Sequence, residues 1–138
     1  MRDRPTLIPE LKVLDFGQSL AFYTNLAGFQ VLYDRPEEAF AMLETHGARL
    51  MIEGITEQSR TWRVGALRRP FGRGINLQIE VDDVDALFQN FVGAHYPIYL
   101  AMEEKWYRSG DTEAGNKQFL VQDPDGYLLR FFQPLGRR

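Results

Sequence analysis

The chain contains no cysteine, which excludes disulfide bonds and thiolate ligands for a metal ion. It also lacks an apolar run of the roughly 18–20 residues that a membrane-spanning helix needs. Its first residues are charged and interrupted by Pro5 and Pro9, unlike a signal peptide. A net charge of −3 gives no reason to expect nucleic acid as a partner. These absences favour a cytoplasmic protein whose partners include neither membranes nor nucleic acids.

The composition is that of one globular domain, with 138 residues, 44% of them hydrophobic and 25% charged. Near the C-terminus, two apolar runs at 119–121 and 127–132 flank the sequence Asp-Pro-Asp-Gly at 123–126. Proline and glycine favour a tight turn, so this stretch predicts a β-hairpin. Arg130 lies within the second apolar run, where a cation needs a partner or an open cavity.

The first half of the chain predicts the element order β-α-β-β-β. A strand is expected over Leu7–Leu14, followed by a helix that Asp15 and Gln18 cap at its start. Gly28 ends this helix, as a glycine after the last turn commonly does. Three further strands are expected at 29–33, 40–43 and 48–52.

The second half repeats that order, which predicts an internal duplication. Alternating residues over Ile75–Val81 indicate a strand, and Asp83 precedes a helix over Val84–Val92. A short strand at 98–100 and the hairpin complete the unit, with a long loop expected at 102–115. We therefore predict a single α+β domain made of module 1–53, linker 54–74 and module 75–138.

The sequence motifs resemble those of the vicinal oxygen chelate superfamily. The pattern V-x-D-x-x-x-S-x-x-F-Y-x-x-x-x-G-F runs from Val13 to Phe29, and D-P-D-G followed by Tyr127 closes the chain. This superfamily includes glyoxalase I, extradiol dioxygenases, fosfomycin-modifying transferases and bleomycin-resistance proteins. The resemblance implies two tandem βαβββ modules that form a cup-shaped mixed sheet, commonly completed in a homodimer.

The resemblance also implies where a divalent metal would be bound in the metal-dependent members. When the family's four metal-ligand positions are transferred to this sequence, they fall on Ile8, Glu53, Asn76 and Arg130. Only Glu53 is a usual ligand, and Arg130 would repel a cation. His46 and His95 lie in an expected turn and loop, so we expect both to be exposed. The chain therefore resembles most closely the bleomycin-resistance branch, which lacks the metal ligands and sequesters a cationic, aromatic glycopeptide at the dimer interface.

Charged and aromatic side chains are the remaining candidates for ligand binding. Glu53 and Arg130 are expected on corresponding strands, where they either form an ion pair that fills the cup or orient a polar ligand; with them we group Asn76. The aromatic candidates are Phe40, Trp62, Trp106, Tyr107 and Phe119. Phe40 and Phe119 are more typical of a core than of a ligand site, whereas the last loop places Trp106 and Tyr107 beside acidic residues that suit a cation. The arginine-rich linker is more typical of a solvated connection than of an anion site.

We therefore predict a metal-free protein that binds an aromatic ligand, which could be cationic, and that acts in antibiotic resistance as a homodimer. The alternative is a metal-dependent lyase of the glyoxalase I type, or a related dioxygenase. It would use Glu53 and a divalent metal such as Zn, Ni, Mn or Fe. A protein whose interface is its only function is the third hypothesis.

Overall fold

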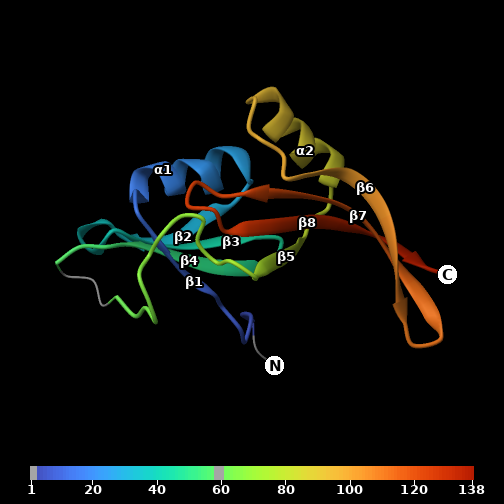
Figure 1. The fold of residues 1–138 in the computed structure, drawn as a ribbon, viewed down its shortest axis with the longest axis horizontal. Helices are drawn as coiled ribbons and strands as arrows, with labels where there is room; N and C mark the ends of the chain where they lie inside the picture. The colour runs from blue at the N-terminus through green and yellow to red at the C-terminus, as the bar shows by residue number, and fades with distance from the viewer. Residues whose placement is uncertain (1–2, 58–60) are drawn as a thin grey trace. The chain divides into compact units, whose positions relative to one another are not determined.

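The computed structural model describes residues 3–57 and 61–138, which form two modules of the same topology (Figure 1). Arg60, one of the linker arginines, lies outside the described residues. Each module has the element order β-α-β-β-β, so the predicted α+β class and the two tandem βαβββ modules are confirmed. Within the described ranges, no helix is long and apolar enough to span a bilayer.

The first module is a four-stranded sheet with the strand order β1-β4-β3-β2. β1 runs parallel to β4, and the other pairs are antiparallel. Its strands are β1 (Glu10–Val13), β2 (Gln30–Arg35), β3 (Phe40–Thr45) and β4 (Ala48–Gly54). Its helices are α1 (Phe16–Ala21), a π-helical continuation η1 (Phe22–Leu26) and a short 3₁₀ turn η2 (Pro36–Glu38).

The second module has the equivalent strand order β5-β8-β7-β6, again with one parallel pair, β5 and β8. Its elements are β5 (Asn76–Glu80), α2 (Val84–Gly93), β6 (Leu100–Ser109), β7 (Thr112–Gln122) and β8 (Leu128–Arg137). The same cap begins both α1 and α2. The Asp15 carboxylate accepts a hydrogen bond from the backbone N–H of Gln18 at 3.0 Å. The Asp83 carboxylate accepts one from the backbone N–H of Ala86, also at 3.0 Å.

The segment predicted as a loop at 102–115 is instead a long hairpin of β6 and β7, and that prediction is wrong. β6 pairs with β7 from Glu103 to Ser109, and the chain reverses at Gly110, whose φ is +65°. Most residues of β6 are exposed, because β6 is the edge strand of its sheet. A polar sequence is therefore compatible with a strand here, since neither face needs to be fully apolar.

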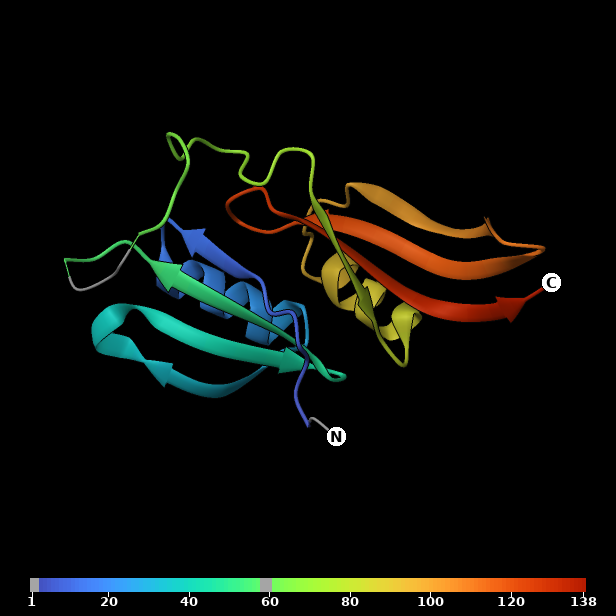
Figure 2. The same cartoon turned by 90° about the horizontal axis from the view of Figure 1, so that it is seen from below.

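Each module buries its core between its helix and one face of its own sheet (Figure 2). In the first module, Val13 and Ile52 from the sheet and Phe22 from η1 are buried in this layer. In the second, the Phe119 ring of β7 contacts the Phe91 ring of α2, with centroids 5.8 Å apart. Since strand residues alternate between faces, the neighbours of these core residues lie on the face opposite the helix.

The Asp-Pro-Asp-Gly turn connects two strands of the second module, yet residues 124–126 belong with residues up to Phe71 in one compact unit. Asp125 explains why. Its buried carboxylate accepts hydrogen bonds from Arg69 Nε at 3.0 Å and from the Leu14 amide at 3.3 Å. Its carbonyl accepts another from the Phe71 amide at 2.8 Å. The turn is therefore held by the first unit.

Candidate functional site

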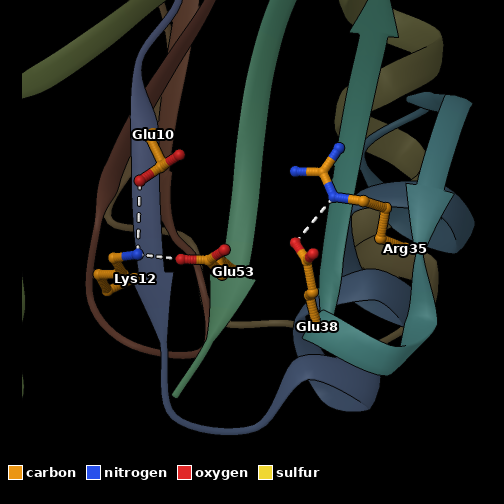
Figure 3. A network of polar contacts seen from close by, with 5 residues as sticks. All are labelled: Glu10, Lys12, Arg35, Glu38 and Glu53. Carbon is orange, nitrogen blue, oxygen red and sulfur yellow. Dashed lines mark hydrogen bonds and ion pairs between the residues drawn. The ribbon is translucent and has the colours of Figure 1, made fainter. Parts of the chain in front are cut away.

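A row of four side chains crosses the sheet of the first module, on the face opposite α1. The strand register places Lys12 beside Glu53, Glu53 beside Phe40, and Phe40 beside Arg35. Figure 3 shows the charged members of this row together with Glu10 and Glu38. Lysine, glutamate and arginine thus share a sheet face with a buried aromatic ring.

Lys12 and Glu53 form an ion pair at the β1 end of this row (Figure 3). Lys12 is 6% exposed and Glu53 is 7% exposed. The Lys12 ammonium also lies 3.4 Å from the Glu10 carboxylate. Burying a charge costs free energy unless a partner compensates for it. The pairing of β1 with β4 supplies that partner, because it places the two opposite charges side by side. The Glu53 carboxylate is consequently already neutralised by a lysine.

Arg35 covers the other end of the row. Its guanidinium lies 3.9 Å from the centroid of the Phe40 ring, a cation–π arrangement, and its Nε donates to Glu38 Oε2 at 2.8 Å. The hydrogen bond to Glu38 is the main cause that raises the pKa of Arg35, and the charge of Glu53 adds to it. Phe40 is therefore buried beneath a cation and is not open to stacking in this arrangement.

The strand register places Glu53 and Arg130 at different positions along their corresponding strands. When the modules are aligned on the caps Asp15 and Asp83, Glu10 corresponds to Gln78. Glu10 lies beside Met51 on β4, whereas Gln78 lies beside Arg130 on β8. Glu53 and Arg130 lie on the corresponding strands β4 and β8, as predicted, and the residue of β4 at the position of Arg130 is Met51. The residue beside Glu53 is Lys12.

The residues present do not fit a divalent metal ion. Ile8 has no ligand atom, Arg130 is cationic, and the Glu53 carboxylate is held by Lys12. Across residues 3–57 and 61–138, no group of three or more His, Cys, Asp or Glu side chains is placed to hold a metal. His46 and His95 are exposed, as predicted.

Arg130 and Gln118 each have polar partners on the face of the second module opposite α2. An Arg130 guanidinium nitrogen donates to Gln78 Oε1 on the neighbouring strand β5. Gln118 Nε2 donates to Glu103 Oε2 and to the Tyr107 hydroxyl, each at 2.8 Å. Each of the two charges predicted to pair with one another, Glu53 and Arg130, thus has a partner in its own module.

Trp106 and Tyr107 are brought to opposite faces of the hairpin, because they are consecutive residues of β6. Tyr107 contacts Gln118 and is 39% exposed. Trp106 packs over Gly115, where a Cβ would lie only 2.8 Å from the indole ring. The Arg138 guanidinium lies over the Trp106 ring, 4.2 Å from its centroid. The two residues cannot contact one ligand from the same face.

The remaining predicted residues lie apart from these clusters. Phe119 is fully buried in the core, where its ring contacts those of Phe88 and Phe131 at 5.1 and 5.6 Å. It is therefore not placed on the face that Arg130 occupies. Trp62 lies in the linker and is 69% exposed, and Asn76 is exposed at the start of β5.

Sequence reasoning missed Lys12 and Gln118. Lys12 stands between Leu11 and Val13 in a short strand. It is therefore a cation among apolar strand residues, as Arg130 is. Gln118 begins the apolar stretch before the last turn, and only the pairing of three strands shows that it is buried.

The sequence profile of the "Glyoxalase/Bleomycin resistance protein/Dioxygenase superfamily" matches residues 9–131. Proteins named "Bleomycin resistance protein" from Geobacillus stearothermophilus and Staphylococcus aureus are 28% identical over 93% of this chain and 96% of their own.

Solved structures agree on the fold. TioX from Micromonospora sp. ML1 aligns with a TM-score of 0.70 at 23% identity, over 94% of this chain and 98% of its own. A virulence protein from Salmonella typhimurium aligns with a TM-score of 0.67 at 15% identity, over 96% and 98%.

Proposed function

Because this chain belongs to the glyoxalase/bleomycin resistance protein/dioxygenase superfamily, we propose that it binds a small aromatic molecule stoichiometrically and without a metal. The observation that carries this proposal is the buried Lys12–Glu53 pair. Glu53 is the one carboxylate among the expected ligand positions, and an ammonium neutralises it. The bleomycin resistance proteins, which are 28% identical over 93% of the chain, support sequestration as the mode of action and antibiotic resistance as the role.

The proposed ligand contacts are the exposed and half-buried members of the predicted set. Tyr107, Arg130 and Asn76 lie on strands of the second module, and Trp62 lies in the linker. Tyr107 suits an aromatic ligand on the second unit and Trp62 would suit one on the first, since stacked rings add roughly 0.5–1.5 kcal/mol beyond the area that they bury.

A positive charge on the ligand is favoured by the balance of charges around Lys12. Two carboxylates, Glu10 and Glu53, share one ammonium, so this cluster carries an excess negative charge. A cationic ligand near this cluster would be attracted by the excess carboxylate, and the Lys12–Glu53 pair would stay intact.

We also propose that the protein acts as a homodimer with its ligand sites at the interface. β2 is an edge strand whose Val31, Leu32 and Tyr33 are 40%, 41% and 50% exposed. Exposed apolar side chains on an edge strand favour pairing with another chain. Light scattering coupled to gel filtration would measure the mass directly; a monomer at all concentrations would contradict this part.

Titration with bleomycin tests the function itself. The protein, treated with EDTA, is titrated while tryptophan fluorescence and heat of binding are followed. We expect saturable binding with one ligand per chain. Absence of saturable binding would contradict the proposal, and turnover of a glyoxalase I substrate after loading with Zn²⁺ or Ni²⁺ would support the lyase instead. The chain has two tryptophans, so single Trp62→Phe and Trp106→Phe variants show which one reports the ligand.

A further inference from the structure

Two buried polar atoms on the Arg130 face of the second module lack hydrogen-bond partners. Among the described residues, nothing pairs with Gln118 Oε1 or with Arg130 Nε. Gln118 is 2% exposed, so bulk solvent does not satisfy its side-chain oxygen. An unpaired buried polar atom is costly, and in native proteins it commonly marks a site for a water or a ligand.

The two atoms differ in chemistry and lie on the same face. Gln118 lies beside Phe132, and Arg130, two residues earlier on β8, lies beside Leu120. Diagonal neighbours of this kind are roughly 7–8 Å apart at Cα, within reach of two long side chains. Both amide hydrogens of Gln118 are engaged by Glu103 and Tyr107, so its oxygen remains as an acceptor, while Arg130 Nε is a donor.

We propose that Gln118 and Arg130 form a subsite for the carboxamide of an aromatic ligand. The amide carbonyl accepts a hydrogen bond from Arg130 Nε, and the amide N–H donates to Gln118 Oε1. The apolar side chains of Leu120 and Phe132 lie on the same face and suit the ring that carries the amide. This inference rests on the proposed binding of a small molecule and names its polar group.

A carboxamide fits better than a carboxylate or a tertiary amide. A carboxylate satisfies Arg130 but sets an oxygen against Gln118 Oε1, and the Glu103 charge lies beside Gln118. A tertiary amide keeps the carbonyl but has no N–H to donate. Each mismatch leaves one buried partner unpaired, which weakens binding by about tenfold.

The experiment is a titration of the full chain with benzamide, N,N-dimethylbenzamide and benzoate, followed by NMR at the arginine Nε–H and glutamine side-chain signals. We expect benzamide to shift the Arg130 and Gln118 signals and to bind about tenfold more tightly than the other two. Equal affinity for benzamide and N,N-dimethylbenzamide, or no shift at Arg130, would overturn the proposal.

Arg130→Met tests the donor, with Arg108→Met as its control. Arg108 is an exposed arginine of β6, one residue after Tyr107 and therefore on the other face. We expect benzamide affinity to fall by about tenfold in Arg130→Met and by less than about twofold in Arg108→Met. Equal losses would overturn the proposal. Thermal unfolding of both variants shows that they are folded.

The two proposals fail in different ways. If bleomycin binds but benzamide does not, the amide subsite is wrong and the proposed function stands. If benzamide binds with the expected selectivity but bleomycin does not, the subsite stands and its natural ligand is a different aromatic amide.

Discussion

Lys12 and Glu53 lie side by side on the parallel strands β1 and β4, and their side chains form a buried ion pair. Each charge depends on the other. Desolvation makes an isolated charge at this position unfavourable, so the pair fixes the orientation of both side chains. For the same reason, the glutamate is not a free ligand.

Removing one member of this pair should therefore be strongly destabilising. Lys12→Met is expected to lower the free energy of unfolding by about 3–5 kcal/mol, because Glu53 is left buried without its partner. The double variant Lys12→Met/Glu53→Leu should recover most of this loss. Urea unfolding followed by circular dichroism measures both.

The control is Lys117, which pairs with Asp85 at 2.8 Å at an exposed position. Lys117→Met should be far less destabilising than Lys12→Met, since exposed pairs are largely screened by solvent. A loss for Lys12→Met that is as small as this would show that the Lys12–Glu53 pair is not buried as described.

The turn at residues 123–126 gives a second prediction. Gly126 has φ +105°, and a Cβ there would lie 2.5 Å from the Pro70 Cβ. Gly136 has φ +98° but nothing within 4 Å of a Cβ, so it measures the backbone strain alone. Gly126→Ala should be less stable than Gly136→Ala by about 1–3 kcal/mol, the cost of overpacking. Equal thermal shifts in the two variants would contradict the close approach of Pro70.

Trp106 is predicted to contribute to stability as well as, or instead of, ligand binding. It packs between Gly115 and Arg138 on the β6–β7 hairpin. Trp106→Ala should lower the free energy of unfolding by about 1–3 kcal/mol. Trp62→Ala, at a position that is 69% exposed, should change it by less than about 0.5 kcal/mol. Similar melting temperatures for the two variants would return Trp106 to the list of side chains available to a ligand.

Tyr96 links stability to alkaline pH. Burial raises the pKa of its hydroxyl to about 12, and the charge of Asp123 adds to this effect. Its hydroxyl donates to the Gln122 carbonyl at 2.6 Å. A raised pKa means that the neutral phenol stabilises the folded state, fully below the usual pKa of about 10. This contribution is lost as the pH rises from about 10 towards 12.

Tyr96→Phe should remove this alkaline loss, and Tyr99→Phe, at an exposed position, should leave it unchanged. Ultraviolet difference spectra of tyrosinate, recorded with unfolding curves across this pH range, provide the measurement. An identical pH dependence in wild type and Tyr96→Phe would contradict the assignment.

Local features of the fold were predictable from the sequence. Asp15 and Asp83 indicate helix starts because each caps a backbone N–H only three residues further along the chain. Gly126 indicates a turn because glycine readily adopts the positive φ found there. The β6–β7 hairpin was missed because an exposed edge strand needs no apolar alternation, so its residues look like those of a loop.

The candidate site was less predictable because it depends on contacts between distant strands. Nothing local to Lys12 shows that it meets Glu53, which follows 41 residues later. The register of β4 against β1 decides that Met51, and not Glu53, corresponds to Arg130. The sequence indicates a loop at Trp106 and Tyr107. Only their placement as consecutive residues of β6 shows that their side chains lie on opposite faces of the hairpin.

The measurement that tests the central claim most directly is the metal content of the purified protein. The protein is exposed to Zn²⁺, Ni²⁺, Mn²⁺ and Fe²⁺, excess metal is removed, and elemental analysis compares wild type with Glu53→Ala. If Lys12 neutralises Glu53, both proteins will contain far less than one metal ion per chain. Near-stoichiometric metal in the wild type that disappears in Glu53→Ala would contradict the account and favour a metal-dependent enzyme.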